Sequence, residues 1–461
     1  MDGTTRQLVD YTTTFAKDDL TDQALTATVN HLFDTIAVGI AGTTAEAGRI
    51  AAGLAGTTSA AVGATVFGGG TGRAPDLAAF ANAVMVRTLD WNDGMQAKGG
   101  GHPSDMIPGL LAAAEIAHSS GLELLLATAL AYELLGGLGS SADRANFDQG
   151  LFMGGATALA AGRLLGLSQD ELGHAASLAL TTALPMGVHR WGALSMTKGA
   201  STAFAVRNGL FCALLARAGF TSAPEPVEGY FGLWSATGEF APRLPVLPGG
   251  PSAIEMAHQK LVPAESQVLG LLDLVPQIRA WTAVEDIAAI DIVVSERARR
   301  HVADPAKYDP QTRETADHSL PYMLAAALTD GEITLDSYLP ERFTDPALRP
   351  LMNKVQVSAS DEFTGIRDQV EGVMRAHPMR VTFRTYSGRS RTEELRYHKG
   401  HFRDPLTQAD LAEKFTRTCR GIVSTRQQKQ ISTAWWGIGS AADVTGPMAL
   451  LAQFEPAEDS L

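Results

Sequence analysis

Residues 106–138 read MIPGLLAAAEIAHSSGLELLLATALAYELLGGL, and this stretch decides the fold class. Its first apolar residues recur at the spacing of a helix with a buried face: Ile107, Leu110, Leu111 and Ala114. Further helical patterns follow, without intervening strand patterns, at 151–166, 169–183 and 199–218. Such a run of helices, rich in alanine and poor in aromatic residues, predicts a mainly α-helical domain with closely packed helices.

The loop before this stretch is the first candidate for chemistry. Residues 89–105, LDWNDGMQAKGGGHPSD, crowd acids, three glycines and His102 between two helical patterns. The glycines allow backbone conformations closed to other residues, whereas Ser104 and Asp105 are good N-caps for the helix that follows. His102 is therefore expected just ahead of a helix N-terminus, where anions bind, and histidine suits proton transfer near neutral pH. The alternative is a disordered surface loop with an incidental histidine.

Length and charge limit the class of protein. At 461 residues the chain is longer than one ordinary domain, and its 45% content of hydrophobic residues supplies an ample core, so we expect two domains. The net charge of −13 argues against binding to nucleic acid or to an anionic membrane surface. A lysine in this acidic background is a candidate for binding a small anion.

The cysteine content limits the chemistry. Cys212 and Cys419 are the two cysteines, which excludes a disulfide framework, a structural zinc site of cysteines and a CxxC redox motif. Two cysteines also cannot supply the three cysteine ligands of an aconitase-type iron–sulfur cluster. No basic-then-apolar signal opens the chain, and the most apolar run, 122–138, contains two glutamates. We expect a soluble, cytoplasmic protein without a metal.

A glycine-rich stretch at 61–74, AVGATVFGGGTGRA, imitates a strand followed by a dinucleotide-binding loop. Its glycines follow the spacing GxGxG rather than GxGxxG, and no second strand bearing an acid follows. Pro75 and Asp76 open a helix over 77–89. We therefore do not interpret the stretch as a nucleotide site.

The second half of the chain differs in composition. Residues 221–262 are rich in proline and glycine, and a helical pattern recurs at 320–328. Strand patterns appear at 288–294, 354–357 and 380–386. This part of the chain predicts an α+β domain.

Helical character marks both ends of the chain, with two helices expected in residues 6–60 and more after residue 407. The fold class is therefore mainly α, with a large all-α domain built from both chain ends and a smaller α+β domain inserted between them. The expected ranges are 1–268 and 402–461 for the all-α domain and 269–401 for the inserted domain.

Three further segments combine a cation with glycine or proline. They read SMTKGA at 195–200, HQKLVPAE at 258–265 and RETADHSLPY at 313–322. Lys198 precedes a long helix, where a cation opposes the helix dipole, and this raises the odds that it binds an anion. Lys260 fits equally well as a solvated loop lysine.

Together with LDWND at 89–93 and GHPSD at 101–105, these segments resemble the MmgE/PrpD family. This family includes 2-methylcitrate dehydratases, cis-aconitate decarboxylases and iminodisuccinate epimerases. The resemblance spans nearly the whole chain and rests on the order and coverage of individually weak motifs. The interval from Asp90 to His102 and the GHPSD wording are most similar to the 2-methylcitrate dehydratase branch.

The resemblance implies the same two-domain arrangement, usually in a homodimer, with an active site between the domains and no metal or organic cofactor. It implies four catalytic residues, namely Asp90, His102, Lys198 and Lys260. The matching segments also supply candidates for substrate binding, namely Asp93, Ser104, Gln149 and His318. One departure concerns residues 146–150, where many members carry a histidine and this chain has Asp148 and Gln149.

The leading hypothesis is dehydration of a 2-hydroxy tricarboxylate such as 2-methylcitrate. Lys198 and Lys260 would neutralise carboxylates and developing charge, and His102, oriented by Asp90, would transfer the proton. The sequence leaves open which group expels the hydroxide. Decarboxylation of cis-aconitate or epimerisation of an iminodicarboxylate on the same scaffold stays an alternative. A non-catalytic helical binding protein is the alternative from another class.

Overall fold

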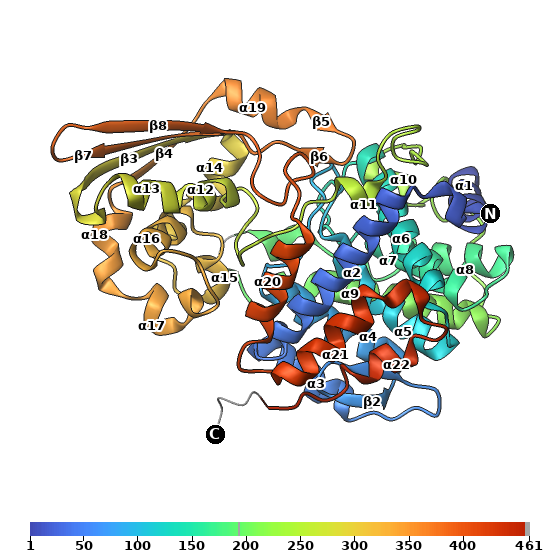
Figure 1. Ribbon diagram of the computed structural model, residues 1–461. Coiled ribbons are helices and arrows are strands. Elements are labelled where there is room, and N and C mark those ends of the chain that lie inside the picture. The colour runs from blue at the N-terminus through green and yellow to red at the C-terminus, as the bar shows by residue number, and fades with distance from the viewer. Residues whose placement is uncertain (192–193, 457–461) are drawn as a thin grey trace. The chain divides into compact units, whose positions relative to one another are not determined.

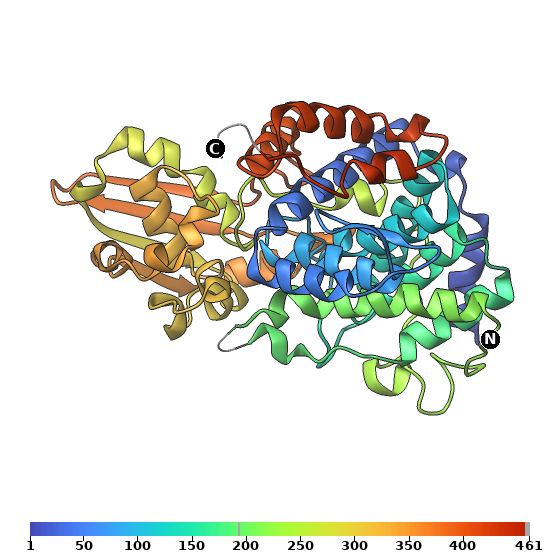
Figure 2. The same ribbon diagram turned by 90° about the horizontal axis from the view of Figure 1, so that it is seen from below.

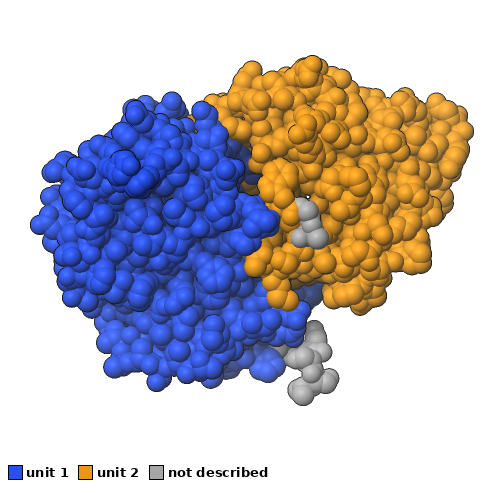
Figure 3. Space-filling model, turned by 180° about the vertical axis from the view of Figure 1, so that it is seen from behind, with its two compact units in different colours: residues 1–189, 199–257, 407–461 blue, residues 190–198, 258–406 orange. Residues whose placement is uncertain are grey.

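The computed structural model describes residues 1–191 and 194–456 (Figure 1). Helices account for 55% of the residues and strands for 9%, which confirms the prediction of a mainly helical protein. Contacts divide the chain into two compact units, coloured separately in Figure 3. Unit 1 comprises Met1–His189, Gly199–Ala257 and Thr407–Leu461, and unit 2 comprises Arg190–Lys198 and His258–Leu406.

Unit 1 is a packed array of helices with one short hairpin. Its longer helices are α1 (Gly3–Thr14), α2 (Asp22–Gly42), α3 (Glu46–Gly56), α4 (Pro75–Thr88), α5 (Ile107–Ala117), α6 (Gly121–Ser141), α7 (Met153–Leu164), α8 (Gln169–Thr181), α9 (Thr197–Arg217), α20 (Gln408–Cys419) and α21 (Thr425–Trp436). Short helices are α10 (Trp234–Thr237), α11 (Ala253–Met256) and α22 (Thr445–Ala449). The C-terminal helices α20 and α21 lie beside α2 (Figures 1 and 2), so both ends of the chain build this unit.

Local sequence signals set several helix ends as expected. Ser168 and Glu171 form the capping box of α8, in which the Ser168 N–H donates to Glu171 Oε2 at 2.7 Å. Thr407 opens α20 in the same way with Asp410. After α9, Gly219 adopts a φ of 89°, a left-handed conformation that glycine supplies at a helix C-terminus.

Three helices are long and apolar enough to cross a membrane by length and composition alone. In α2, α6 and α9, respectively 72%, 89% and 61% of the most apolar window is buried inside the protein. The apolar residues of α6 therefore mostly face other helices, which explains why this helix is apolar on nearly all sides.

The number of helices predicted for residues 6–60 was wrong. Residues 6–60 form three helices rather than two, because the Thr43 and Thr44 hydroxyls donate to the Ile40 and Ala41 carbonyls and end α2. Residues 61–74, which imitate a strand followed by a dinucleotide-binding loop, contain β1 (Ala64–Val66) and β2 (Gly70–Arg73). These strands pair antiparallel in a hairpin, so they do not form the βαβ unit of a dinucleotide site.

Unit 2 contains a four-stranded sheet in the order β4-β3-β7-β8 (Figure 1). The strands are β3 (Ile287–Val294), β4 (Val355–Ala359), β7 (Met379–Thr385) and β8 (Ser390–Leu395). β3 pairs in parallel with β4 and antiparallel with β7, and β7 and β8 form a hairpin. The first three strands confirm the predicted strand patterns, whereas β8, which reads SRTEEL, carries too few apolar residues to show one.

Helices cover one face of this sheet and form the core of unit 2. Ile290 and Ile292 of β3 and Phe383 of β7 belong to one buried cluster with Met323 and Leu324 of α16. The helices of this unit are α12 (Leu269–Asp273), α13 (Val275–Trp281), α14 (Glu296–Val302), α15 (Arg313–Ala316), α16 (Leu320–Asp330), α17 (Pro340–Phe343), α18 (Arg349–Met352) and α19 (Asp361–Asp368). A minimal hairpin joins β5 (Val370–Glu371) to β6 (Met374–Arg375).

The boundaries of the two units differ from the expected domain ranges. Residues 190–198, 258–268 and 402–406 belong to unit 2, although the sequence placed them in the helical part. The Gln259 N–H donates to the Gly400 carbonyl at 2.9 Å, which pairs the segment entering unit 2 with the segment leaving it. Backbone pairing between such distant positions has no periodic signal in a sequence.

Candidate active site

His102 lies at the end of the glycine loop, directly before the 3₁₀ turn η2 (Pro103–Met106), which runs into α5. Its side chain is 7% exposed, and Nδ1 lies 2.5 Å from the main-chain oxygen of Asp93. A carbonyl oxygen only accepts hydrogen bonds, so Nδ1 carries a hydrogen and donates it. In neutral His102 the lone pair is therefore on Nε2, where a proton can be accepted.

The three glycines before His102 permit close packing. The Met95 N–H donates to the Gly101 carbonyl at 2.7 Å, and the Gly99 N–H donates to the Gly139 carbonyl at 2.6 Å. A Cβ at Gly100 would lie 2.2 Å from the Met95 oxygen. The loop is buried and bonded across its own ends, which excludes the alternative of a disordered surface loop.

Ser104 and Asp105 were predicted to cap α5, but they do not. Both lie inside η2, and the N-cap position of α5 is Met106. Ser104 Oγ instead donates to Asp93 Oδ1 at 2.6 Å, and Asn92 Nδ2 donates to Ser104 Oγ and to Asp105 Oδ1, each at 2.9 Å. Because these side chains bond back to the preceding loop, they hold the loop rather than the helix end.

The Asp93 carboxylate is 1% exposed and lies at the centre of a hydrogen-bond network. It accepts from His31 Nδ1 at 3.0 Å, from Tyr132 Oη at 2.6 Å, and from the Ser104 N–H and Oγ at 3.0 and 2.6 Å. Burial raises the pKa of this carboxyl, but the hydrogen bond and charge of His31 and the other donors outweigh it and hold the pKa below its usual value.

Asp90 is paired with an arginine. It follows α4 with a φ of 51°, which is uncommon for a residue with a side chain. Arg87 Nη1, from the last turn of α4, donates to Asp90 Oδ1 at 2.9 Å, and both residues are 2% exposed. The expected role of Asp90 in orienting His102 stays a prediction, whereas the partner found for His102 Nδ1 is the Asp93 carbonyl.

Asp148 and Gln149 occupy the position of the expected departure from the family. Asp148 is 1% exposed, and its Oδ1 accepts from Ser201 Oγ at 2.9 Å. The Gln149 side chain packs against Gly101, where an added Cβ would lie 3.0 Å from Gln149 Cβ. Gln149 therefore lies beside the residue that precedes the loop histidine.

In unit 2, Lys198 belongs to a buried charged cluster. It lies in the first turn of α9 rather than before it, and its Nζ lies 3.0 Å from both oxygens of Asp317. His318 Nδ1 lies 2.6 Å from Asp317 Oδ1, and Arg313 Nη1 lies 3.5 Å from Oδ2. Lys198 and Arg313 therefore both pair with the buried Asp317 carboxylate.

His301 extends this cluster. Its ring centroid lies 5.2 Å from that of His318, with the rings at 81° to each other. Burial lowers the pKa of His301 well below its usual value, and the charges of His318 and nearby cations lower it further. His301 is therefore neutral at physiological pH, and protonating its ring costs free energy.

Lys260 is completely buried, which excludes the alternative of a solvated loop lysine. Its Nζ donates to the Ala264 carbonyl at 3.0 Å. Burial and then the charge of Lys260 lower the pKa of His398 to about 4. The ring of His398 lies 5.1 Å from that of His258, so Lys260 neighbours a group of buried histidines.

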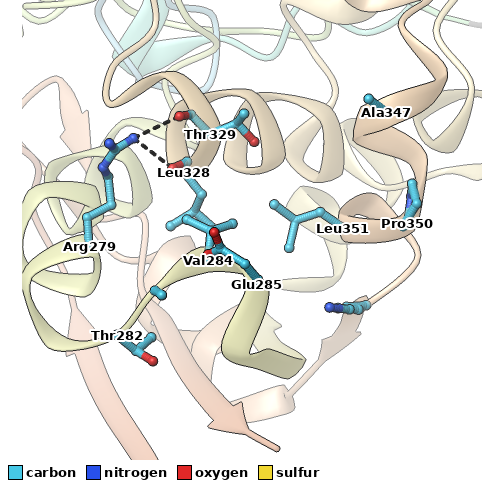
Figure 4. Close-up of a pocket in the computed structure, with 11 residues that line it drawn as sticks. Arg279, Thr282, Val284, Glu285, Leu328, Thr329, Ala347, Pro350 and Leu351 are labelled. Carbon is cyan, nitrogen blue, oxygen red and sulfur yellow. Dashed lines mark hydrogen bonds between the residues drawn. The ribbon is translucent and has the colours of Figure 1, made fainter.

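A surface cavity of about 520 Å³ in unit 2 lies apart from these groups (Figure 4). Leu328 and Leu351 contribute apolar side chains, and Arg279 Nη1 donates to the Leu328 and Thr329 carbonyls at 2.8 and 3.0 Å. A cation on the last carbonyls of α16 stabilises the helix end. The lining includes none of the eight residues that the sequence singled out, so we assign this cavity no part in catalysis.

Sequence reasoning missed several residues of these networks, among them His31, Arg87, Tyr132, His301 and Asp317. Arg87 lies three residues before Asp90 at a helix end, a spacing that allows a side-chain pair. Asp317 lies inside the segment 313–322, next to His318. His31 and Tyr132 each interrupt an apolar helical pattern, and the sequence does not show which acid they meet.

Comparisons with known proteins agree with the motifs. Residues 6–241 match the MmgE/PrpD N-terminal domain, and residues 263–436 match the MmgE/PrpD C-terminal domain. Human cis-aconitate decarboxylase is 27% identical over 428 residues, which cover 88% of this chain and 85% of the relative. The 2-methylcitrate dehydratases of Escherichia coli K12 and Cupriavidus necator are 28% and 27% identical over 390 and 387 residues, covering 77% and 78% of this chain and 78% of each relative.

Proposed function

This chain belongs to the MmgE/PrpD family, and we propose that it is a cofactor-independent lyase that dehydrates a 2-hydroxy tricarboxylate such as 2-methylcitrate. The observation that carries the proposal is the hydrogen bond from His102 Nδ1 to the Asp93 carbonyl. When His102 is neutral, this bond puts the lone pair on Nε2, which can then act as a general base. The names of the relatives support a lyase in general terms.

The proposed reaction removes one molecule of water. His102 Nε2 takes the proton from the carbon beside a substrate carboxylate, and the electrons of that C–H bond form the new C=C bond. The neighbouring C–O bond breaks, and the departing hydroxide takes a proton and leaves as water. General acid–base help of this kind contributes about 10²- to 10⁴-fold to the rate.

Buried cations supply the counter-charge that a tricarboxylate needs. Lys198 and Lys260 are 1% and 0% exposed, so each would act at low local dielectric. Lys198 acts as part of the cluster with Asp317 and Arg313. We propose that these cations bind substrate carboxylates and stabilise the charge that develops as the proton leaves.

Decarboxylation of cis-aconitate is the second candidate, because the human decarboxylase and the Escherichia coli dehydratase have nearly the same identity to this chain, 27% and 28%. The residues at 148 and 149 favour dehydration. A decarboxylase that relied on the histidine expected in that segment would be impaired by Asp148 and Gln149. Epimerisation of an iminodicarboxylate is a third candidate, because the same scaffold can carry that reaction.

A direct assay tests the proposal. The purified protein is mixed separately with 2-methylcitrate, citrate and cis-aconitate, while ultraviolet absorbance follows the conjugated product and a CO₂ detector follows decarboxylation. Absorbance gain from a 2-hydroxy tricarboxylate without CO₂ supports the dehydratase. CO₂ release from cis-aconitate identifies the decarboxylase instead, and no turnover on any substrate favours a non-catalytic binding protein.

We also propose that this enzyme acts as a homodimer, as the family resemblance implies, and that it is located in the cytoplasm. Light scattering coupled to size exclusion measures the mass against the 48.7 kDa of one chain. Cell fractionation measures the location. A monomer that turns over at full rate would contradict the dimer expectation.

A further inference from the structure

The carboxylate and the main-chain carbonyl of Asp93 have different partners, and together they tie His102 to the helices of unit 1. We propose that Asp93 is a positioning residue that fixes His102 with its hydrogen on Nδ1. The inference rests on the proposed function, in which His102 Nε2 is the base. It gives Asp93 a different role from the substrate contact expected from the sequence.

The protein itself fills the hydrogen-bonding capacity of the Asp93 carboxylate. A carboxylate offers about four lone-pair positions. Four donors from His31, Tyr132 and Ser104 approach the two oxygens at 2.6 to 3.0 Å. Because the group is 1% exposed, a substrate hydroxyl could reach it only by displacing one of these donors.

The donors come from three separate elements. His31 belongs to α2, Tyr132 to α6 and Ser104 to η2. The rings of His31 and Tyr132 also pack edge to face, with centroids 5.4 Å apart and planes at 67°. Anchoring from three elements holds the main chain at Asp93 more rigidly than the glycine-rich loop could by itself, because each supporting side chain is packed in the helical core.

The chemistry of the acceptors assigns the hydrogens in this network. The Asp93 carboxylate can only accept, so His31 Nδ1 and the Tyr132 hydroxyl must each donate. Burial, followed by the negative charge of Asp93, raises the pKa of Tyr132 well above its usual value and keeps the phenol protonated. The carbonyl of Asp93 then remains in place to accept the hydrogen of His102 Nδ1.

The tautomer of His102 is the functional consequence. A neutral imidazole carries one hydrogen, and only the form with that hydrogen on Nδ1 has a lone pair on Nε2. If the Asp93 carbonyl moves, both tautomers become populated, and the fraction with hydrogen on Nε2 cannot take a proton there. Loss of the anchor should therefore reduce kcat while the cationic groups still bind substrate.

The tautomer can be measured without any turnover. The full-length protein is labelled with ¹⁵N-histidine, and the His102 signals are identified by their absence in His102→Asn. We expect wild-type His102 to carry its hydrogen on Nδ1 at pH 7.5, and Tyr132→Phe and Asp93→Asn to show a growing fraction with hydrogen on Nε2. A wild-type His102 with hydrogen on Nε2 would overturn the proposal.

Kinetics separate positioning from substrate contact. For Tyr132→Phe we expect kcat to fall about fivefold, and for Asp93→Asn about 10²-fold, with KM changed by less than about threefold in both. A KM raised tenfold or more at unchanged kcat in Asp93→Asn would show that this carboxylate binds substrate, contrary to the proposal.

Controls keep the two proposals distinguishable. Tyr322→Phe, in unit 2, removes another fully buried hydroxyl that donates to the Ser337 carbonyl, so the same change there should leave the His102 signals unchanged. If Asp93→Asn does not fold, Tyr132→Phe and the wild-type tautomer still decide the inference. A wild-type protein without turnover but with hydrogen on Nδ1 would contradict the proposed function alone.

Discussion

Lys414 Nζ lies 2.6 Å from Asp34 Oδ1, and both side chains are almost completely buried. The same Nζ donates to the main-chain oxygen of Trp91 at 2.8 Å. Lys414 is on α20, near the C-terminus, whereas Asp34 is on α2 and Trp91 is in the loop that carries His102. Through these two contacts Lys414 connects α20 with α2 and with the candidate catalytic loop.

Replacing Lys414 should destabilise the protein strongly. Burial raises the pKa of Asp34 and the charge of Lys414 opposes this, so Lys414→Met leaves a buried acid without its counter-charge. We expect a loss of about 3–5 kcal/mol in the free energy of unfolding, measured by urea denaturation. Lys429→Met, at an exposed position on α21, is the matched control.

Two further variants extend this test. Asp34→Leu combined with Lys414→Met should cost less than Lys414→Met alone, because no charge then remains buried.

A chain ending at residue 401 should be insoluble, since it lacks α20 and the apolar residues that cover α2. A folded, active chain of that length would contradict the expectation that both chain ends build one helical domain.

Replacing His102 should affect turnover more than binding. His102→Asn keeps a donor near the position of Nδ1 and removes Nε2, so kcat should fall about 10²-fold or more at nearly constant KM. Lys198→Ala and Lys260→Ala should raise KM as well, because they remove cations. His118→Asn and Lys17→Ala, at exposed positions, are the controls. Near wild-type turnover of the His102 variant would remove the loop from the mechanism.

Asp317→Asn should disturb two candidate residues at once. The Asp317 carboxylate bonds to Lys198 and to His318, so an amide in its place loses the charge that holds both. We expect kcat/KM to fall about tenfold or more, mainly through a higher KM, in steady-state assays. Asp330→Asn removes a carboxylate partly exposed beside Arg342 and should leave both parameters unchanged. Equal effects of the two variants would contradict a specific role for Asp317.

Acid should destabilise unit 2 through its buried histidines. Burial, with Lys260 near His398 and Arg403 near His401, lowers the pKa of His398 to about 4 and that of His401 to about 3. In the unfolded chain these histidines have the ordinary pKa of 6.5 and take up protons below that pH, whereas in the folded protein they stay neutral. The free energy of unfolding is therefore at its full value above pH 6.5 and declines as the pH falls towards 4.

The slope of the free energy of unfolding against pH can be measured by urea denaturation between pH 7 and pH 4. His398 alone contributes up to about 1.4 kcal/mol per pH unit. His398→Asn keeps a donor to the Lys399 carbonyl but cannot titrate, so it should flatten the decline, whereas His118→Asn should not. The same slope in wild type and His398→Asn would refute this explanation.

Activity should survive chelators and anaerobic handling. The chain has two cysteines, which cannot supply the three ligands of an aconitase-type iron–sulfur cluster, and its sequence shows no metal-ligand spacing. The assay is repeated after dialysis against EDTA and under argon, with and without added divalent metals. Activity that disappears with EDTA and returns with one metal would end the cofactor-free mechanism.

The sequence by itself determined the helical class, three of the four strands of the unit 2 sheet and the segments that carry the candidate residues. Helices and strands repeat their apolar residues at 3.6 and 2 residues, so 106–138 and 380–386 could be recognised without any partner. Caps such as Ser168 act within one turn and were equally readable. The family motifs were recognised because their residues lie close together in the chain.

Only the tertiary structure decided what those residues contact. His31 and Asp93 are 62 residues apart, and Lys198 and Asp317 are 119 apart, so no local pattern joins either pair. Ser104 had the composition of an N-cap, yet its hydroxyl bonds to Asp93 because the buried carboxylate needs donors more than the helix end does. Hydrogen-bond partners are chosen by the packing of distant elements, and this choice made Asp93 the acid that holds His102.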